Sequence, residues 1–318
     1  MRTPQALDAE MSTYLSTQPP APIFSADTLQ SIRAERAAAP QPELSERVER
    51  INVEIRSDPP LEIRIHRPKG IKGPAAAIYS MHGGGYVVGS FMVDDARLDS
   101  WCGRFGCVGL SVNYRLSPET PYPGPLDDCY AGLEWVFEHA AELGIDPRRI
   151  GLFGGSAGGG LAAGLTLRAR DIGELNPAFQ MLFYPMLDDR QMTRSSQWTD
   201  VPSWTPHSNT FGWRSYLGGL YGTTDVPAYA APARAKDLSG LPPTYIMVGS
   251  LDAFYDEDVA FANRLIHAGV AADLSVYAGA GHGFERSDNR TILAVRARRD
   301  ADEWLSARLG AGPTTPSA

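Results

Sequence analysis

Gly154-Gly155-Ser156-Ala157-Gly158 joins an apolar segment, residues 149–153, to an Ala- and Leu-rich segment, residues 157–170. The first segment is typical of a buried strand and the second of a helix, so Ser156 is expected on a strand-to-helix turn. Glycines on either side remove side chains that would collide in so tight a turn. The serine hydroxyl is then free to act as a nucleophile beside the first amides of the helix. A glycine-rich loop that only turns the chain would show the same pattern.

A second glycine-rich stretch follows another strand-like run. Residues 75–82 are mostly apolar and lead into His82-Gly83-Gly84-Gly85. Glycines after a strand let bare backbone N–H groups approach a substrate oxygen, as in the oxyanion-hole loops of lipases and esterases. We expect Gly83 and Gly84 to donate there, with Ala157 as the third donor, and His82 to brace the loop.

Two further polar residues come directly after strand-like runs. Asp252 follows residues 244–249, and His282 follows residues 274–277. Loops at the carboxyl ends of parallel strands share one edge of a sheet, so these side chains can converge with Ser156. His282 would take the proton of Ser156, and Asp252 would orient the imidazole.

Asp256 and Asp258 are rivals for the acidic position. Both lie in the predicted helix after Asp252, where acidic residues in a first turn usually interact with the helix dipole and with water. We favour Asp252, because a strand-end loop is where this architecture presents its acid.

Together these stretches resemble the hormone-sensitive-lipase-like family of α/β-hydrolases, whose bacterial members are carboxylesterases. The resemblance extends from about residue 61 to the last predicted helix. One position departs from the family, since Gly155 stands where an aspartate usually precedes the serine. The stretches that carry the resemblance are His82-Gly83-Gly84-Gly85, Asn113-Tyr114-Arg115-Leu116-Ser117-Pro118-Glu119, Tyr122-Pro123 with Asp127-Asp128, Gly154-Gly155-Ser156-Ala157-Gly158-Gly159, Tyr184-Pro185, Asp252 and His282-Gly283-Phe284.

Composition indicates an ordinary globular protein. The chain has 318 residues, of which 43% are hydrophobic and 21% charged, and its net charge is −8. Without a cluster of Lys and Arg, nucleic acids and anionic membranes are poor partner candidates. No signal peptide or membrane-spanning run is evident, and an odd number of cysteines, three, suits a reducing compartment, so we expect a cytoplasmic protein. No metal-ligand spacing is present, and we expect neither a metal nor a cofactor.

Alternating strand-like and helix-like segments after about residue 50 predict an α/β fold with a mostly parallel central sheet and helices on both faces. Residues 49–55 and 61–66 alternate apolar and polar side chains, as an antiparallel hairpin at the sheet edge does. We assign residues 45–189 and 230–318 to the catalytic core. Residues 1–44 and 190–229 interrupt the alternation, and we assign them to a helical cap.

The cap is expected to cover the nucleophile and to set substrate selectivity, as the resemblance implies. We expect Trp204, Phe211 and Trp213 of the insertion to contact substrate, together with Gly85 and Tyr86 beside the oxyanion loop. Any one ring of the insertion could equally belong to the core of the cap. The aromatic residues of the insertion are Trp198, Trp204, Phe211, Trp213, Tyr216 and Tyr221.

The motifs predict a carboxylic ester hydrolase that acts on short-chain acyl esters through an acyl-enzyme intermediate. An amidase, a lactonase or a deacetylase would use the same triad. A small-molecule receptor on this fold is a third possibility, although such a protein would be expected to have lost His282. A homodimer through an edge strand or the last helix is compatible with the sequence.

Overall fold

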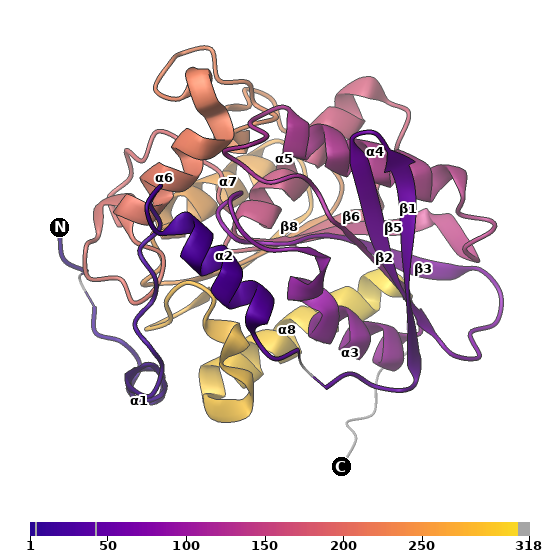
Figure 1. Ribbon diagram of the computed structural model, residues 1–318, viewed down its shortest axis with the longest axis horizontal. Coiled ribbons are helices and arrows are strands. Elements are labelled where there is room, and N and C mark those ends of the chain that lie inside the picture. The colour runs from indigo at the N-terminus through magenta and orange to yellow at the C-terminus, as the bar shows by residue number, and fades with distance from the viewer. Residues whose placement is uncertain (4, 42, 311–318) are drawn as a thin grey trace.

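The computed structural model describes residues 1–310 except Pro4 and Pro42. An eight-stranded sheet forms the centre of the molecule (Figure 1). Strands β1 and β2 form an antiparallel hairpin at one edge, and β2 pairs antiparallel with β4. From β4 to β8 all neighbouring strands are parallel. The order across the sheet is β1 (Val48–Ser57), β2 (Pro60–Pro68), β4 (Val108–Val112), β3 (Ala75–Met81), β5 (Ile145–Gly155), β6 (Phe179–Phe183), β7 (Thr244–Gly249) and β8 (Ala272–Tyr277).

Helices cover both faces of this sheet (Figure 1). The α-helices of the described residues are α1 (Ala9–Ser16), α2 (Leu29–Ala38), α3 (Asp95–Phe105), α4 (Gly124–Glu138), α5 (Ala157–Ile172), α6 (Pro206–Leu217), α7 (Tyr255–His267) and α8 (Ile292–Leu309). Short 3₁₀ turns are η1 (Phe91–Asp94), η2 (Ser195–Gln197), η3 (Gly218–Leu220), η4 (Pro232–Arg234) and η5 (Phe284–Arg290). The α/β fold with a mostly parallel sheet and an edge hairpin is therefore confirmed.

Successive side chains of a strand enter two different hydrophobic clusters. In β3, Tyr79 and Met81 pack toward α4, α5 and α7, whereas Ile78 packs toward α3 and α8. This alternation explains why all of β3 is buried and reads as a continuous apolar run.

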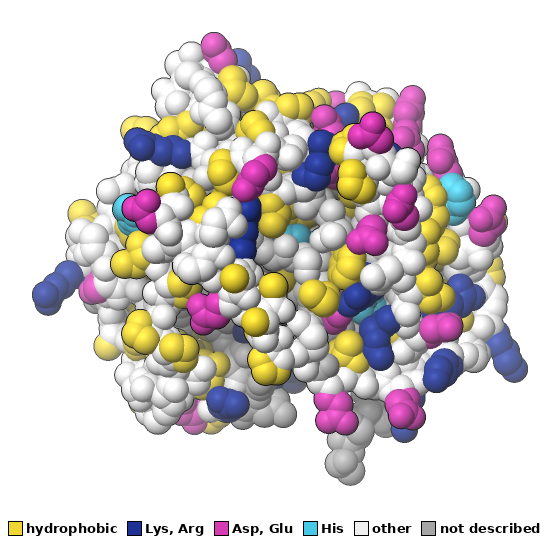
Figure 2. Space-filling model, in the orientation of Figure 1, with side chains coloured by type: hydrophobic (Ala, Val, Ile, Leu, Met, Phe, Trp, Pro, Cys, Tyr) yellow, Lys and Arg dark blue, Asp and Glu magenta, His cyan; other side chains and the backbone are white. Residues whose placement is uncertain are grey.

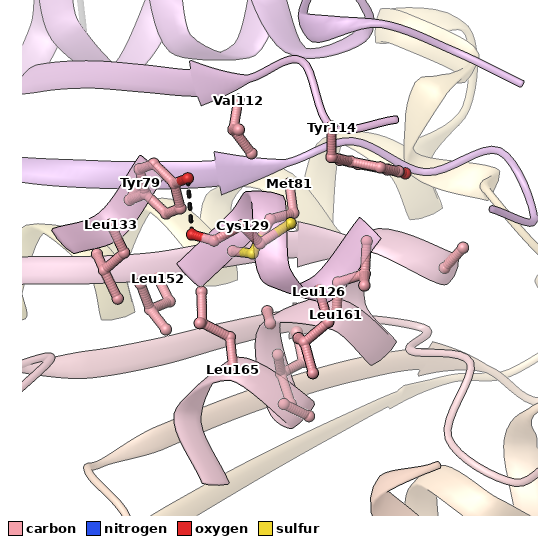
Figure 3. Packing of buried hydrophobic residues seen from close by; sticks show 14 of the residues in the cluster. Tyr79, Met81, Val112, Tyr114, Leu126, Cys129, Leu133, Leu152, Leu161 and Leu165 are labelled. Carbon is pink, nitrogen blue, oxygen red and sulfur yellow. Dashed lines mark hydrogen bonds between the residues drawn. The ribbon is translucent and has the colours of Figure 1, made fainter. Parts of the chain in front are cut away.

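The α4 side of the sheet includes one polar contact within an apolar layer (Figure 3). The Tyr79 hydroxyl donates to the Cys129 carbonyl at 3.0 Å. It lies so close to α4 that a Cβ on Gly132 would come within 2.2 Å of it. Glycine at this helical position therefore lets α4 pack tightly on β3, which in turn holds the start of the oxyanion loop.

The two segments assigned to the cap meet at the active-site edge of the sheet. The Phe24 amide donates to the Ser208 hydroxyl at 3.2 Å, and the Phe24 ring lies 5.2 Å from that of Trp204. Helix α1, in contrast, packs on η5, and the Asp8 amide donates to Gly279. The N-terminal segment thus contacts both the insertion and the loop before His282. The division of the chain into core and cap stays a prediction.

Candidate active site

Ser156 lies between β5 and α5 in a backbone conformation that L-residues rarely adopt, with φ 58° and ψ −125°. The surrounding backbone leaves no room for side chains at Gly154 and Gly158. A Cβ on Gly154 would lie 2.1 Å from the Gly158 carbonyl oxygen, and one on Gly158 would lie 2.0 Å from that of Met81. Gly158 is therefore required by the packing of the elbow against β3, and Gly154 by the tightness of the elbow itself.

Ser156, His282 and Asp252 form one hydrogen-bonded chain. The Ser156 hydroxyl lies 3.0 Å from His282 Nε2, and His282 Nδ1 lies 2.8 Å from Asp252 Oδ2. Asp252 is fully buried, and its other oxygen accepts the Phe254 amide at 3.0 Å. Since the carboxylate accepts a proton at Nδ1, Nε2 is left to accept the serine proton.

Aromatic rings hold the imidazole on two sides. The Tyr184 ring meets it edge to face at 4.6 Å, and the Phe254 ring does so at 5.2 Å. The Tyr184 hydroxyl donates to buried Glu285 at 2.6 Å, which fixes this ring in turn. Neither aromatic residue was among the site residues predicted from sequence.

The other two acids have different surroundings. Asp256 Oδ2 accepts the Ser195 amide at 2.7 Å and so holds the beginning of the insertion. Asp258 is fully buried with no hydrogen-bond partner among the residues that the structure describes, and burial, followed by the charge of Glu257, raises its pKa well above the ordinary value. Of the three acids considered, Asp252 is the one that contacts His282.

The predicted oxyanion donors surround the serine. Gly83 lies so close to Ser156 that a Cβ on it would come within 3.3 Å of the serine Cβ. Gly83 and Gly84 line the cavity that contains the Ser156 side chain. Ala157 is the first residue of α5, where the helix itself provides no acceptor for its N–H. These amides can stabilise a negatively charged oxygen bound beside Ser156.

His82 contacts the oxyanion loop and not the cavity. Its Nδ1 lies 2.9 Å from the Gly83 carbonyl oxygen, and its ring stacks on Tyr114 at 4.2 Å. Burial lowers the pKa of His82 to about 4, so the ring is neutral at pH 7. The Tyr114 hydroxyl donates to the His82 carbonyl at 2.7 Å, which further ties the loop to the segment after β4.

A cavity of about 170 Å³ opens next to Ser156. Of the five predicted substrate contacts, Gly85 and Trp204 line it, and they also touch each other, since a Cβ on Gly85 would lie 2.3 Å from the Trp204 ring. The lining residues are Ala21, Pro22, Phe24, Arg36, Gly83, Gly84, Gly85, Val93, Ser156, Tyr184, Ser203, Trp204, His282, Gly283 and Arg286.

Tyr86, Phe211 and Trp213 lie outside this cavity, which corrects the expected lining. Tyr86 is fully buried, stacks on Tyr216 at 4.0 Å and donates its hydroxyl to the Met186 carbonyl at 3.3 Å. Trp213 packs in the same aromatic cluster, and Phe211 is half-buried beside it. The contacts of Trp213 with Tyr86 and Tyr216 join α6 to the core, and large rings packed in this way stabilise such a contact.

Residues 21–36 form part of the cavity wall although they precede Ser156 by more than a hundred positions. Helix α2 is anchored by Arg33, which donates to the Val87 carbonyl at 2.8 Å and forms a bidentate ion pair with Glu119. The apolar spacing of α2 predicts a helix, but no pattern in it indicates a cavity wall.

The described residues form neither a candidate metal site nor a helix that could cross a membrane. Within residues 1–310, apart from 4 and 42, no group of three or more His, Cys, Asp or Glu residues could hold a metal ion. The helices in this part of the chain include none with the length and apolar character that crossing a membrane requires.

Gly155 is the position at which the family usually has an aspartate. A Cβ on Gly155 would lie at an ordinary 3.7 Å from Tyr184, so this position has room for a side chain.

Comparison with known proteins points in the same direction. A family model described as the alpha/beta hydrolase fold matches residues 78–286. The chain is 33% identical over 250 residues to Esterase LipI of Mycobacterium tuberculosis, covering 74% of this chain and 78% of the relative. It is 35% identical over 227 residues to Carboxylesterase NlhH of the same species, covering 70% and 71%. The solved structure titled "Bacterial Heroin Esterase" superimposes with a TM-score of 0.90 at 38% identity, covering 96% of this chain and 98% of that one.

Proposed function

This chain belongs to the hormone-sensitive-lipase-like family of α/β-hydrolases and is a carboxylic ester hydrolase, and on that premise we propose that Ser156, His282 and Asp252 carry the reaction. The observation that supports this most is the hydrogen-bonded chain from Asp252 through His282 to the Ser156 hydroxyl. It offers a nucleophile, a base and an orienting acid in one line.

In the proposed mechanism, Ser156 Oγ attacks the ester carbonyl while His282 Nε2 takes its proton. The amides of Gly83, Gly84 and Ala157 stabilise the oxyanion. His282 then protonates the leaving alcohol, and the acyl group stays on Ser156. Water, activated by His282, hydrolyses this acyl-enzyme and restores the serine, while Asp252 stabilises the imidazolium in each half-reaction.

We expect a preference for short acyl chains. Each buried methylene contributes about 0.8 kcal/mol until the chain meets a wall, and Trp204 and Phe24 bound a cavity of about 170 Å³. In a series of 4-nitrophenyl esters, kcat/KM should be highest between acetyl and hexanoyl. Trp204→Ala should move the optimum toward longer chains. An optimum at decanoyl or beyond in the unsubstituted enzyme would contradict this expectation.

Deleting residues 1–44 should reduce kcat/KM for the best of these esters by roughly tenfold or more, because one wall of the cavity is removed. The thermal midpoint of unfolding should fall as well. Arg33→Ala is the matched point variant, since it loosens α2 without shortening the chain. An unchanged kcat/KM and chain-length profile after deletion would show that these residues take no part in binding.

The same residues could cleave an amide or a lactone, so the selectivity for esters needs its own comparison. Matched 4-nitrophenyl acetate and 4-nitroacetanilide differ in the scissile bond, and we expect activity on the ester alone.

Cytoplasmic location and a homodimer stay predictions, which fractionation of cells and analytical ultracentrifugation would test.

A further inference from the structure

Two arginines line the cavity that contains Ser156. Arg36 comes from α2, and Arg286 comes from η5, shortly after His282. Arg36 is exposed to solvent, and the side chain of Arg286 is 46% exposed. No Asp or Glu is among the described residues that line this cavity. A substrate bound there would therefore meet two cations and no anion.

The carboxylate nearest to Arg286 is already engaged. Glu285 Oε1 lies 2.7 Å from the Arg97 guanidinium and accepts the Tyr184 hydroxyl at 2.6 Å, whereas Arg286 Nε is 3.7 Å away. Asp94, which also acts on Arg286 at longer range, is buried and accepts the Ser80 hydroxyl at 2.7 Å. Arg286 is thus only partly neutralised.

Arg36 has no ion pair with any described residue, and its nearest acidic neighbour in the chain, Glu35, acts on it only at longer range. Its guanidinium lies over the Phe24 ring, 5.5 Å from the centroid. Partial desolvation, and next the positive charge of Arg286, lower the pKa of Arg36. Because Arg36 and Arg286 line the same cavity, their two positive charges repel each other across it, and a bound anion would relieve that repulsion.

A second cavity continues the positive charge. Arg286 and Val93 line both the first cavity and a neighbouring one of about 540 Å³. Four arginines and two acidic residues line the second cavity. Its charged residues are Arg97, Arg104, Arg286, Arg298, Glu285 and Asp302. Arg97 pairs with Glu285 and Arg104 with Asp302, so a substrate that extends from Ser156 past Arg286 would meet an excess of two positive charges.

The described surface around α2 shows no broad positive patch (Figure 2). The net charge is −8, and the face that α2 crosses carries basic, acidic and hydrophobic side chains interspersed (Figure 2). Selectivity for a negative substrate would therefore depend on these local arginines and not on a broad positive surface.

We propose that this esterase selects esters with a carboxylate on the acyl or the alcohol part, and that Arg36 and Arg286 bind that carboxylate. The inference rests on the proposed triad and its cavity. A guanidinium presents paired N–H donors that match the two oxygens of a carboxylate, and such charge-assisted bonds are stronger than neutral ones. Arg36 and Arg286 act in binding and take no part in bond cleavage.

The test compares kcat/KM for pairs of esters that differ in the carboxylate. Mono-4-nitrophenyl glutarate against 4-nitrophenyl pentanoate probes the acyl side, and 4-acetoxybenzoate against 4-methylphenyl acetate probes the alcohol side. In at least one pair the anionic ester should have the higher kcat/KM, and the ratio should fall as salt is added. Arg36→Gln should lower that ratio by about tenfold or more, through KM of the anionic ester, and Arg286→Gln should act likewise. Arg36→Lys should restore part of it.

Arg148→Gln is the matched control, because Arg148 is 87% exposed and lies at the start of β5, at the opposite end of that strand from Ser156. It should leave the ratio unchanged. A ratio at or below one in both pairs, or Arg36→Gln lowering both members of a pair equally, would overturn the inference while the ester hydrolase stands. If Arg286→Gln does not fold, Arg36→Gln decides alone. Hydrolysis that persists in Ser156→Ala would instead overturn the proposed triad.

Discussion

Ser156→Ala should reduce kcat for 4-nitrophenyl butyrate by about 10⁴-fold or more, and His282→Ala should do the same. The Ser156 hydroxyl contacts His282 at 3.0 Å, so either change removes the attacking oxygen or the base that receives its proton. The double variant should be no slower than either single variant, because the residues act as one unit. The release of 4-nitrophenol, followed by absorbance, measures activity, and thermal unfolding of the same preparations shows whether each variant is folded.

Ser203→Ala is the matched control for the nucleophile. Ser203 lines the same cavity, but its hydroxyl donates to the His282 carbonyl at 2.9 Å and does not reach the reacting atoms. Its loss should cost far less activity than that of Ser156. If Ser156→Ala kept more than a few per cent of kcat with an intact fold, another residue would have to be the nucleophile.

Asp252→Asn should be the next most damaging change, with kcat lower by about 10⁴-fold. An asparagine keeps the shape of the side chain but can donate to Nδ1, which favours the imidazole tautomer whose Nε2 carries a proton. That tautomer cannot accept the serine proton. Steady-state kinetics across the pH range, on protein whose unfolding midpoint is checked, would measure this loss.

Asp256→Asn separates the triad role from a structural one. Asp256 holds the Ser195 amide at 2.7 Å and not the imidazole, so this variant should stay within a few fold of the unsubstituted enzyme. The opposite ranking of the two variants would transfer the acidic role to α7.

The order of the core elements could be predicted because each strand is a short apolar run that ends in a polar or glycine-rich turn. Residues 75–80, 179–184 and 244–248 were expected as strands, and β3, β6 and β7 each agree within one position. The same logic brought Ser156, Asp252 and His282 to one edge, because parallel strands order their terminal loops without any knowledge of side-chain packing.

The cavity wall could not be predicted in this way. The presence of an aromatic residue in the insertion does not indicate whether its ring faces the cavity or the core of the cap. Trp204 lines the cavity, whereas Trp213, in the same segment, is fully buried away from it. The assignment of residues 1–44 to the cap placed α2 near the nucleophile, but the sequence did not indicate which of its residues face the cavity, since that depends on Arg33 reaching Val87 and Glu119 from a distant part of the chain. Such contacts follow from tertiary packing and leave no local periodicity.

The elbow glycines have a meaning that extends to related chains. Gly154 and Gly158 are required by backbone atoms that a Cβ would overlap, and neither glycine touches the proton path through His282. A descendant that lost His282 would still need both glycines in order to fold. The pattern from Gly154 to Gly158 therefore indicates ancestry and fold. Whether a related chain is still an enzyme has to be inferred from the residue at the position of His282.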